Sequence, residues 1–168
     1  INMILELAQR KTEGDLKKLY VMGCLSERFM DELGKEIPEV DRYYGKFDWT
    51  RLLADLGPEY DETIGNERHI TTPSHYAYLK ISEGCNRRCA FCAIPLIRGE
   101  HVSVPMEDLI KEAELLAKKG VKELILIAQD LTYYGRDIDG QFHIVELVKR
   151  LLEIKEFEWI RLHYGYPQ

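Results

Sequence analysis

The chain has 168 residues, of which 45% are hydrophobic and 31% are charged, a composition and length typical of a soluble globular protein with a buried core. Lys or Glu interrupts every apolar run, which excludes a membrane-spanning segment. The formal net charge of −6 disfavours a broad electrostatic contact with nucleic acid, unless a separate basic domain supplies one.

The first part of the chain alternates between helical and strand patterns. A helix is predicted over 1–13, because apolar residues recur there at helical spacing and Gly14 is placed to end it. We then expect a strand at 19–22, a helix that includes 27–33, a strand at 40–44 and a helix for which Asp48 is the N-cap. This order predicts a small β/α domain over 1–57.

Between Gly57 and Pro73 the apolar periodicity disappears, and Pro, Gly, Asn and Thr accumulate. Such a composition is typical of a connection between domains. We therefore predict a linker over 58–73 and a second domain over 74–168.

The second domain repeats the order strand, loop, helix. We expect a strand at 76–82, a loop with three cysteines, a helix whose first residue is Pro105, a buried strand at 123–128, a loop at 129–141, a helix at 143–154 and a strand at 159–164. The inward-facing residues of the two helices are predicted to be Met106, Leu109, Ile110, Ala113, Leu116 and Ala117, and then Ile144, Leu147, Val148, Leu151 and Leu152. Three such units are part of a TIM-like barrel, so the predicted class is α/β. If the strands are parallel, the loops that follow them meet at one edge of the sheet, where such folds have their sites.

Cys85, Cys89 and Cys92 are the residues with the clearest chemistry. Their spacing, C-x3-C-x2-C, provides three soft thiolates from one short loop, which is enough to hold a 4Fe-4S cluster by three of its irons. The fourth iron would remain open and could chelate a small molecule. This spacing therefore favours a catalytic cluster over one that only transfers electrons.

Two other roles for these cysteines are compatible with their chemistry. A Cys3His zinc site would need a fourth ligand such as His75 or His101, although zinc ligands are usually arranged as spaced pairs. A disulfide framework is disfavoured, because the three cysteines lie too close together and only Cys24 lies elsewhere. We therefore expect a reducing, intracellular environment and a cytoplasmic protein.

The cysteine loop, CNRRCAFC, resembles the cluster-binding motif of the radical S-adenosylmethionine (SAM) enzymes. Further segments resemble the methylthiotransferases within that superfamily: VMGCL at 21–25, IPEVD at 37–41, KISEGC at 80–85 and CAIPLIRG at 92–99. The segment IAQDLTYYG, at 127–135, is more similar to the branch that modifies a ribosomal protein than to the branch that modifies tRNA adenosine. The resemblance covers nearly the whole chain.

This resemblance implies an enzyme that cleaves SAM into methionine and a 5′-deoxyadenosyl radical. In the ribosomal-protein branch, the radical removes a hydrogen from the β-carbon of an aspartate in protein twelve of the small ribosomal subunit, and a methylthio group is installed there. The implied partners are this ribosomal protein, an electron donor and a sulfur source. The tRNA branch is the alternative within the family, and the acidic net charge weakly opposes it.

The same resemblance implies a second 4Fe-4S cluster, held by three cysteines of an N-terminal methylthiotransferase domain. Cys24 aligns with the last of these, and its two partners have no counterpart in this chain. Because the first residue is Ile1 and the barrel is partial, we expect a fragment without the C-terminal RNA-binding-type module that could contact nucleic acid, and we expect no turnover by it alone. Val104 departs from the family, which usually has arginine at this position.

Four further residues are candidates for the SAM pocket: Phe91, Arg98, Gln129 and Asp130. Phe91 could pack near the adenine or shield the cluster. Arg98 could pair with the SAM carboxylate or remain a solvated charge. Gln129 and Asp130 follow a strand, where polar groups can either meet a ligand or form a turn.

Overall fold

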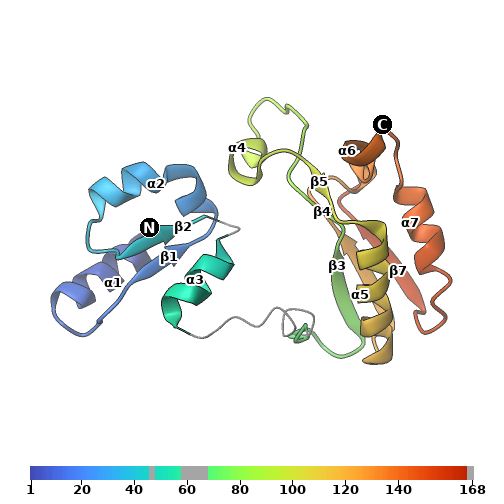
Figure 1. The fold of residues 1–168 in the computed structure, drawn as a ribbon, viewed down its shortest axis with the longest axis horizontal. Helices are drawn as coiled ribbons and strands as arrows, with labels where there is room; N and C mark the ends of the chain where they lie inside the picture. Colours follow the sequence, from blue (N-terminus) through green and yellow to red (C-terminus); the bar gives the residue numbers. More distant parts are fainter. Residues whose placement is uncertain (46–47, 58–67, 166–168) are drawn as a thin grey trace. The chain divides into compact units, whose positions relative to one another are not determined.

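A computed structural model of the chain describes residues 1–45, 48–57 and 68–165. The chain divides into two compact units, Ile1–Glu67 and Arg68–Gln168, and each has its own core (Figure 1). Most of the predicted linker lies outside the described residues. None of the helices in the described part of the chain has the length and apolar character required to cross a membrane.

The first unit contains a pair of short parallel strands and three helices. Strand β1 (Tyr20–Met22) pairs with β2 (Arg42–Tyr44), and the helices are α1 (Asn2–Thr12), α2 (Cys24–Glu36) and α3 (Trp49–Leu56). This order of elements confirms the β/α prediction. Asp48 is the N-cap of α3, but its carboxylate accepts a hydrogen bond from the Gly45 amide (2.9 Å) instead of from an amide of the helix.

The second unit is built on a parallel sheet with the strand order β3-β6-β7. The strands are β3 (Tyr76–Lys80), β6 (Glu123–Ile127) and β7 (Trp159–His163). Helices α5 (Met106–Lys118) and α7 (Ile144–Leu151) contribute to one core with the sheet (Figure 1). The fully buried residues of this core include Leu79, Leu109, Leu124, Leu126, Leu147 and Leu151. The predicted α/β fold with parallel strands is confirmed.

The predicted strand at 76–82 is interrupted at Ile81. Its amide donates to the Ile127 carbonyl (3.1 Å), whereas its carbonyl accepts the Val104 amide (2.9 Å). The chain therefore changes partners at this residue. Strand β4 (Ser82–Glu83) then pairs antiparallel with β5 (Val102–Ser103), which the sequence did not predict.

Other differences concern the ends of helices and two loops. Pro105 is the N-cap of α5, with an extended ψ of 135°, and is not its first helical residue. Helix α7 ends at Leu151, so Leu152 is 59% exposed and the prediction that it faces inward is wrong. Three short helical segments were not predicted: α4 (Ile94–Arg98), the 3₁₀ helix η2 (Leu131–Tyr133) and α6 (Arg136–Asp139).

Tyr134 anchors the segment after β6 to the start of α5. Its hydroxyl donates to the Val104 carbonyl (2.9 Å), and its side chain is almost completely buried. Burial, assisted by the nearby carboxylates of Asp137 and Glu146, raises the pKa of Tyr134 to about 12. The Val104 side chain packs against the core of the unit, while its carbonyl accepts the hydrogen bond from Tyr134.

We expect Leu126→Ala to destabilise the second unit by about 2–5 kcal/mol, because it leaves a cavity in the middle of the sheet. Leu126 has 0% exposure and lies in the central strand. Urea denaturation followed by circular dichroism measures the effect. Leu152→Ala is the matched control, since the same atoms are removed from an exposed side chain, and its cost should stay within about 0.5 kcal/mol. Equal costs for the two variants would contradict this description of the core.

Candidate functional site

The cysteines of the triplet lie on the loop that follows β4, at the carboxyl edge of the parallel sheet. Cys85 is buried, Cys89 and Cys92 are exposed, and all three are free thiols. The three cysteines line one cavity of about 380 Å³ together with Ile94 of α4, Arg87 of the same loop, Ala128, Gln129 and Asp130 after β6, and Tyr164 after β7. The loops that follow three parallel strands thus meet at one edge, as the β/α pattern predicted.

Gly84 fixes the point at which the cysteine loop begins. Its φ of +80° favours glycine, and a Cβ added there would lie 1.9 Å from the Glu100 carbonyl oxygen. The next residue, Cys85, donates its amide to the Gly99 carbonyl (3.1 Å). The Asn86 side chain accepts the His101 amide (2.9 Å), so the first residues of the loop are held against 99–101.

Arg87 connects the loop to the segment after β6. Its amide donates to Cys85 Sγ (3.4 Å), and its Nε donates to Asp130 Oδ2 (2.9 Å). The other oxygen of Asp130 accepts the amide (3.0 Å) and the hydroxyl (2.6 Å) of Thr132. Burial opposes the ionisation of Asp130, but the hydrogen bonds from Thr132 and Arg87 lower its pKa overall. Asp130 therefore lines the cavity with both carboxylate oxygens already engaged.

Glu83 joins three polar side chains beside the cavity. Its carboxylate accepts a hydrogen bond from Gln129 Nε2 (3.0 Å), pairs with Lys80 and lies 3.5 Å from Arg98 Nη1. Burial opposes the ionisation of Glu83, whereas the hydrogen bond from Lys80 and the charges of Lys80 and Arg98 lower its pKa overall. The predicted SAM-pocket residue Arg98 lies next to Glu83 and is not among the residues that line either cavity at this edge. Sequence reasoning missed Glu83, although it directly precedes Gly84.

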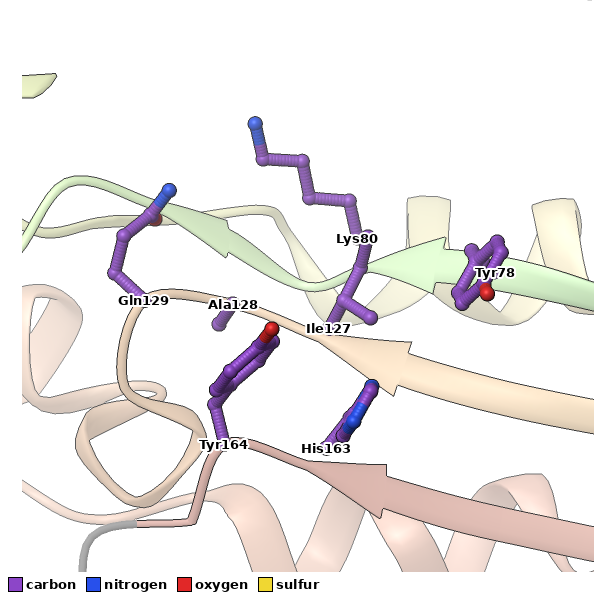
Figure 2. Close-up of a pocket in the computed structure, with 7 residues that line it drawn as sticks. All are labelled: Tyr78, Lys80, Ile127, Ala128, Gln129, His163 and Tyr164. Carbon is purple, nitrogen blue, oxygen red and sulfur yellow. The ribbon is translucent and has the colours of Figure 1, made fainter.

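A second cavity, of about 410 Å³, lies beside the first at the carboxyl end of the sheet. Figure 2 shows its lining side chains, Tyr78, Lys80, Ile127, Ala128, Gln129, His163 and Tyr164, along the ends of the three strands. Ala128, Gln129 and Tyr164 also line the cysteine cavity, so the two cavities share a wall. Sequence reasoning missed Lys80, His163 and Tyr164. The signal that could have found them is their place at, or directly after, the last residue of a strand.

Tyr164, which borders both cavities, has an unusual backbone conformation. Its φ of +70° is the single positive φ of a non-glycine residue in the described part of the chain. Its ring stacks on that of His163, with 4.6 Å between centroids and 21° between planes. Backbone strain of this kind is concentrated at functional sites.

Other sequence candidates lie away from these two cavities. Phe91 is 98% exposed and is not among the residues that line either cavity. Cys24 is exposed at the first residue of α2, in the other unit.

The structure gives no support to a zinc site. The carbonyl of His75 accepts the amides of Lys122 and Glu123 (2.8 and 2.9 Å), at the amino edge of the sheet. The ring of His101 contacts Ser103 Oγ at 3.2 Å. Over residues 1–45, 48–57 and 68–165, no three His, Cys, Asp or Glu side chains are grouped to hold a single metal ion. That finding includes the three cysteines, so the preference for an iron–sulfur cluster rests on the kind of donor, three thiols of one loop without a histidine.

Gly84→Ala should destabilise the second unit more than Gly120→Ala. Gly120 also has a positive φ, of +89°, but nothing lies within 4 Å of a Cβ added there. The control therefore reports backbone strain alone, about 1–2 kcal/mol, whereas Gly84→Ala adds a collision with the backbone of Glu100. Thermal denaturation of the two variants measures the difference. Equal melting temperatures would show that Gly84 is not packed as described.

Comparison with known proteins agrees with the geometry of the site. Residues 79–166 match the radical SAM superfamily. Over 167 residues, the chain is 60% identical to a protein of Phocaeicola vulgatus, 60% to one of Bacteroides thetaiotaomicron and 57% to one of Flavobacterium johnsoniae. Each of these is named ribosomal protein uS12 methylthiotransferase RimO. The alignments cover 99% of this chain but 39%, 38% and 38% of these relatives, so the chain spans about two fifths of their length. The superfamily match covers more than half of the chain, which therefore belongs to the radical SAM superfamily.

Proposed function

We propose that the chain is the part of a methylthiotransferase that cleaves SAM, and that the full enzyme adds a methylthio group to ribosomal protein uS12. The observation that supports this most strongly is the position of the cysteines. All three line one cavity at the carboxyl edge of a parallel sheet, in a chain 60% identical along 99% of its length to a uS12 methylthiotransferase. The target atom in this proposal is the β-carbon of an aspartate.

Cys85, Cys89 and Cys92 are the residues that would hold the 4Fe-4S cluster, because three thiolates leave one iron open. When bound, the cluster supplies the electron that cleaves the C–S bond of SAM. The chain itself has to orient SAM beside these cysteines and keep the cleavage site separate from bulk water.

Gln129 is the side chain that we assign to SAM. Its Nε2 donates to Glu83, which orients the amide, and its Oε1 is buried without a hydrogen-bond partner among the described residues. A buried acceptor without a partner is costly, so a ligand that donates an N–H to it would be favoured. The amino group of SAM is such a donor. Arg98 in this proposal acts on Glu83 and so on the orientation of Gln129.

Cys24 is assigned to a second 4Fe-4S cluster, which would handle the sulfur. It is exposed at the start of α2, where a thiol is accessible to a metal cluster. The remaining ligands of that cluster, the electron donor and the sulfur source would come from outside this chain.

Replacement of any one of Cys85, Cys89 or Cys92 by alanine in the full-length enzyme should abolish the formation of 5′-deoxyadenosine, because two thiolates cannot hold the cluster with a single open iron. The measurement combines iron and sulfide analysis after anaerobic reconstitution with chromatography of the nucleoside product. Cys24→Ala is the matched control: it should still produce deoxyadenosine but no methylthiolated product. Undiminished deoxyadenosine from Cys85→Ala, or tightly held zinc in the wild type, would contradict the proposed cluster.

The substrate is tested with the full-length reconstituted enzyme, SAM, a reductant and sulfide. We expect mass spectrometry to detect one added methylthio group on uS12 and none on tRNA. The same mixture without SAM is the blank. Modification of tRNA alone would contradict the proposed substrate, while leaving the role of the cysteine triplet intact.

A further inference from the structure

Asp130 occupies an unusual place for a carboxylate. It is 3% exposed and lines the cysteine cavity, yet none of its oxygens is free. Its Oδ1 accepts two hydrogen bonds from Thr132, as the N-cap of η2, and this fixes the orientation of the carboxylate. The remaining oxygen, Oδ2, accepts Arg87 Nε from the cysteine loop. Both oxygens of Asp130 are therefore taken up by Arg87 of the cysteine loop and by Thr132.

Arg87 is held at both its backbone and its side chain. The backbone amide donates to Cys85 Sγ at 3.4 Å, and the guanidinium pairs with Asp130 and lies 5.9 Å from the ring centre of Tyr133. The arginine side chain is 27% exposed, so solvent screens this pair only in part. The position of the Arg87 amide next to Cys85 Sγ is thus linked, through the arginine side chain, to the carboxylate of Asp130 on another loop.

Both contacts bear on an iron–sulfur cluster in a predictable way. N–H hydrogen bonds to the cysteine sulfurs and nearby charges set the reduction potential of such a cluster. A positive charge nearby favours the reduced form, which carries one more electron, and a negative charge disfavours it. Asp130 and Arg87 together are neutral, but loss of either one leaves a net charge at this place beside the cysteine loop.

We propose that Asp130 is a positioning residue that acts through Arg87: it holds the amide of Arg87 against Cys85 Sγ and balances the arginine charge beside the cluster. The proposal rests on the function proposed above, since it requires that Cys85, Cys89 and Cys92 bind a 4Fe-4S cluster. It replaces the expectation that Asp130 contacts SAM directly.

The test uses the full-length enzyme, reconstituted anaerobically and studied without SAM or substrate. Asp130→Asn is nearly isosteric and keeps an oxygen for the Thr132 amide, but it places an NH2 group opposite Arg87 Nε, so it removes both the negative charge and the hydrogen bond to the arginine. Arg87→Gln removes the opposite charge, and the double variant removes both. Glu123→Gln is the matched control, because Glu123 also pairs with an arginine (Arg161 Nε at 2.7 Å) but lies at the other end of β6. A redox titration monitored by electron paramagnetic resonance gives the midpoint potential.

The two single variants should shift the midpoint potential in opposite directions. Asp130→Asn should raise it, because the arginine charge is then unbalanced. Arg87→Gln should lower it, because the hydrogen bonds from Thr132 keep Asp130 ionised. The double variant should return close to the wild-type value, and Glu123→Gln should not differ from it. We also expect both single variants to lose iron to a chelator roughly tenfold faster, because each lacks one charged hydrogen bond that holds the cysteine loop.

A purely structural role for Asp130 would move both single variants in the same direction, or would change iron loss without changing the potential; either result overturns the proposal. A double variant whose shift equals the larger single shift would also overturn it. Failure of the wild type to form any cluster would instead overturn the proposed function itself, so the two failures can be distinguished.

Discussion

Parallel pairing of β6 with both of its neighbours is the constraint on which the site depends. The register aligns Lys80, Ile127 and His163 at the ends of the three strands, so the segments that follow are brought to one edge. A shift of one residue would exchange the two faces of a strand, and Leu124 and Leu126 would leave the core. The free energy of burying these apolar residues therefore also fixes the positions of the polar residues at the edge. Cys85 and Gln129 line one cavity because β3, which leads through β4 into the cysteine loop, is paired with β6. The same pairing brings Arg87 to Asp130, 43 residues further along the chain.

The cysteine loop itself depends on polar contacts more than on apolar packing. Gly84 lies against the backbone of Glu100, Asn86 binds the His101 amide, and Arg87 pairs with Asp130. Such contacts are directional, and each buried partner is costly to leave unpaired, so together they specify one conformation. They are concentrated around Cys85, whereas Cys89 and Cys92 remain exposed. Cys85 is therefore fixed by its surroundings, and Cys89 and Cys92 lie on the accessible side of the loop.

Sequence patterns predicted most of this architecture because its larger elements are strongly periodic. The apolar stripe of α5 and the uninterrupted apolar run of β6 identify a helix and a buried strand without ambiguity. The two-residue strands β4 and β5 are too short to have a period, so their pairing could not be predicted. The spacing of the cysteines led to the radical SAM superfamily, which the family match confirms, but the partner of Asp130 could not be inferred. The end of a strand predicts where a side chain lies but not which neighbour it will bind. Asp130 was a candidate for the SAM pocket, and its carboxylate accepts hydrogen bonds from Thr132 and Arg87.

The shared wall between the two cavities has a consequence for how the site can work. Ala128, Gln129 and Tyr164 border both the cysteine cavity and the cavity at the end of the sheet. A molecule bound beside the cysteines that also reaches the sheet must therefore pass these residues. The sheet-side cavity adds Tyr78, Lys80 and His163, whose aromatic and cationic groups differ from the thiols of its neighbour. One cavity thus has thiols in its wall, which the proposed function assigns to the cluster, and the other has groups suited to an aromatic or anionic molecule. Tyr164, with its positive φ, lies where the two cavities meet.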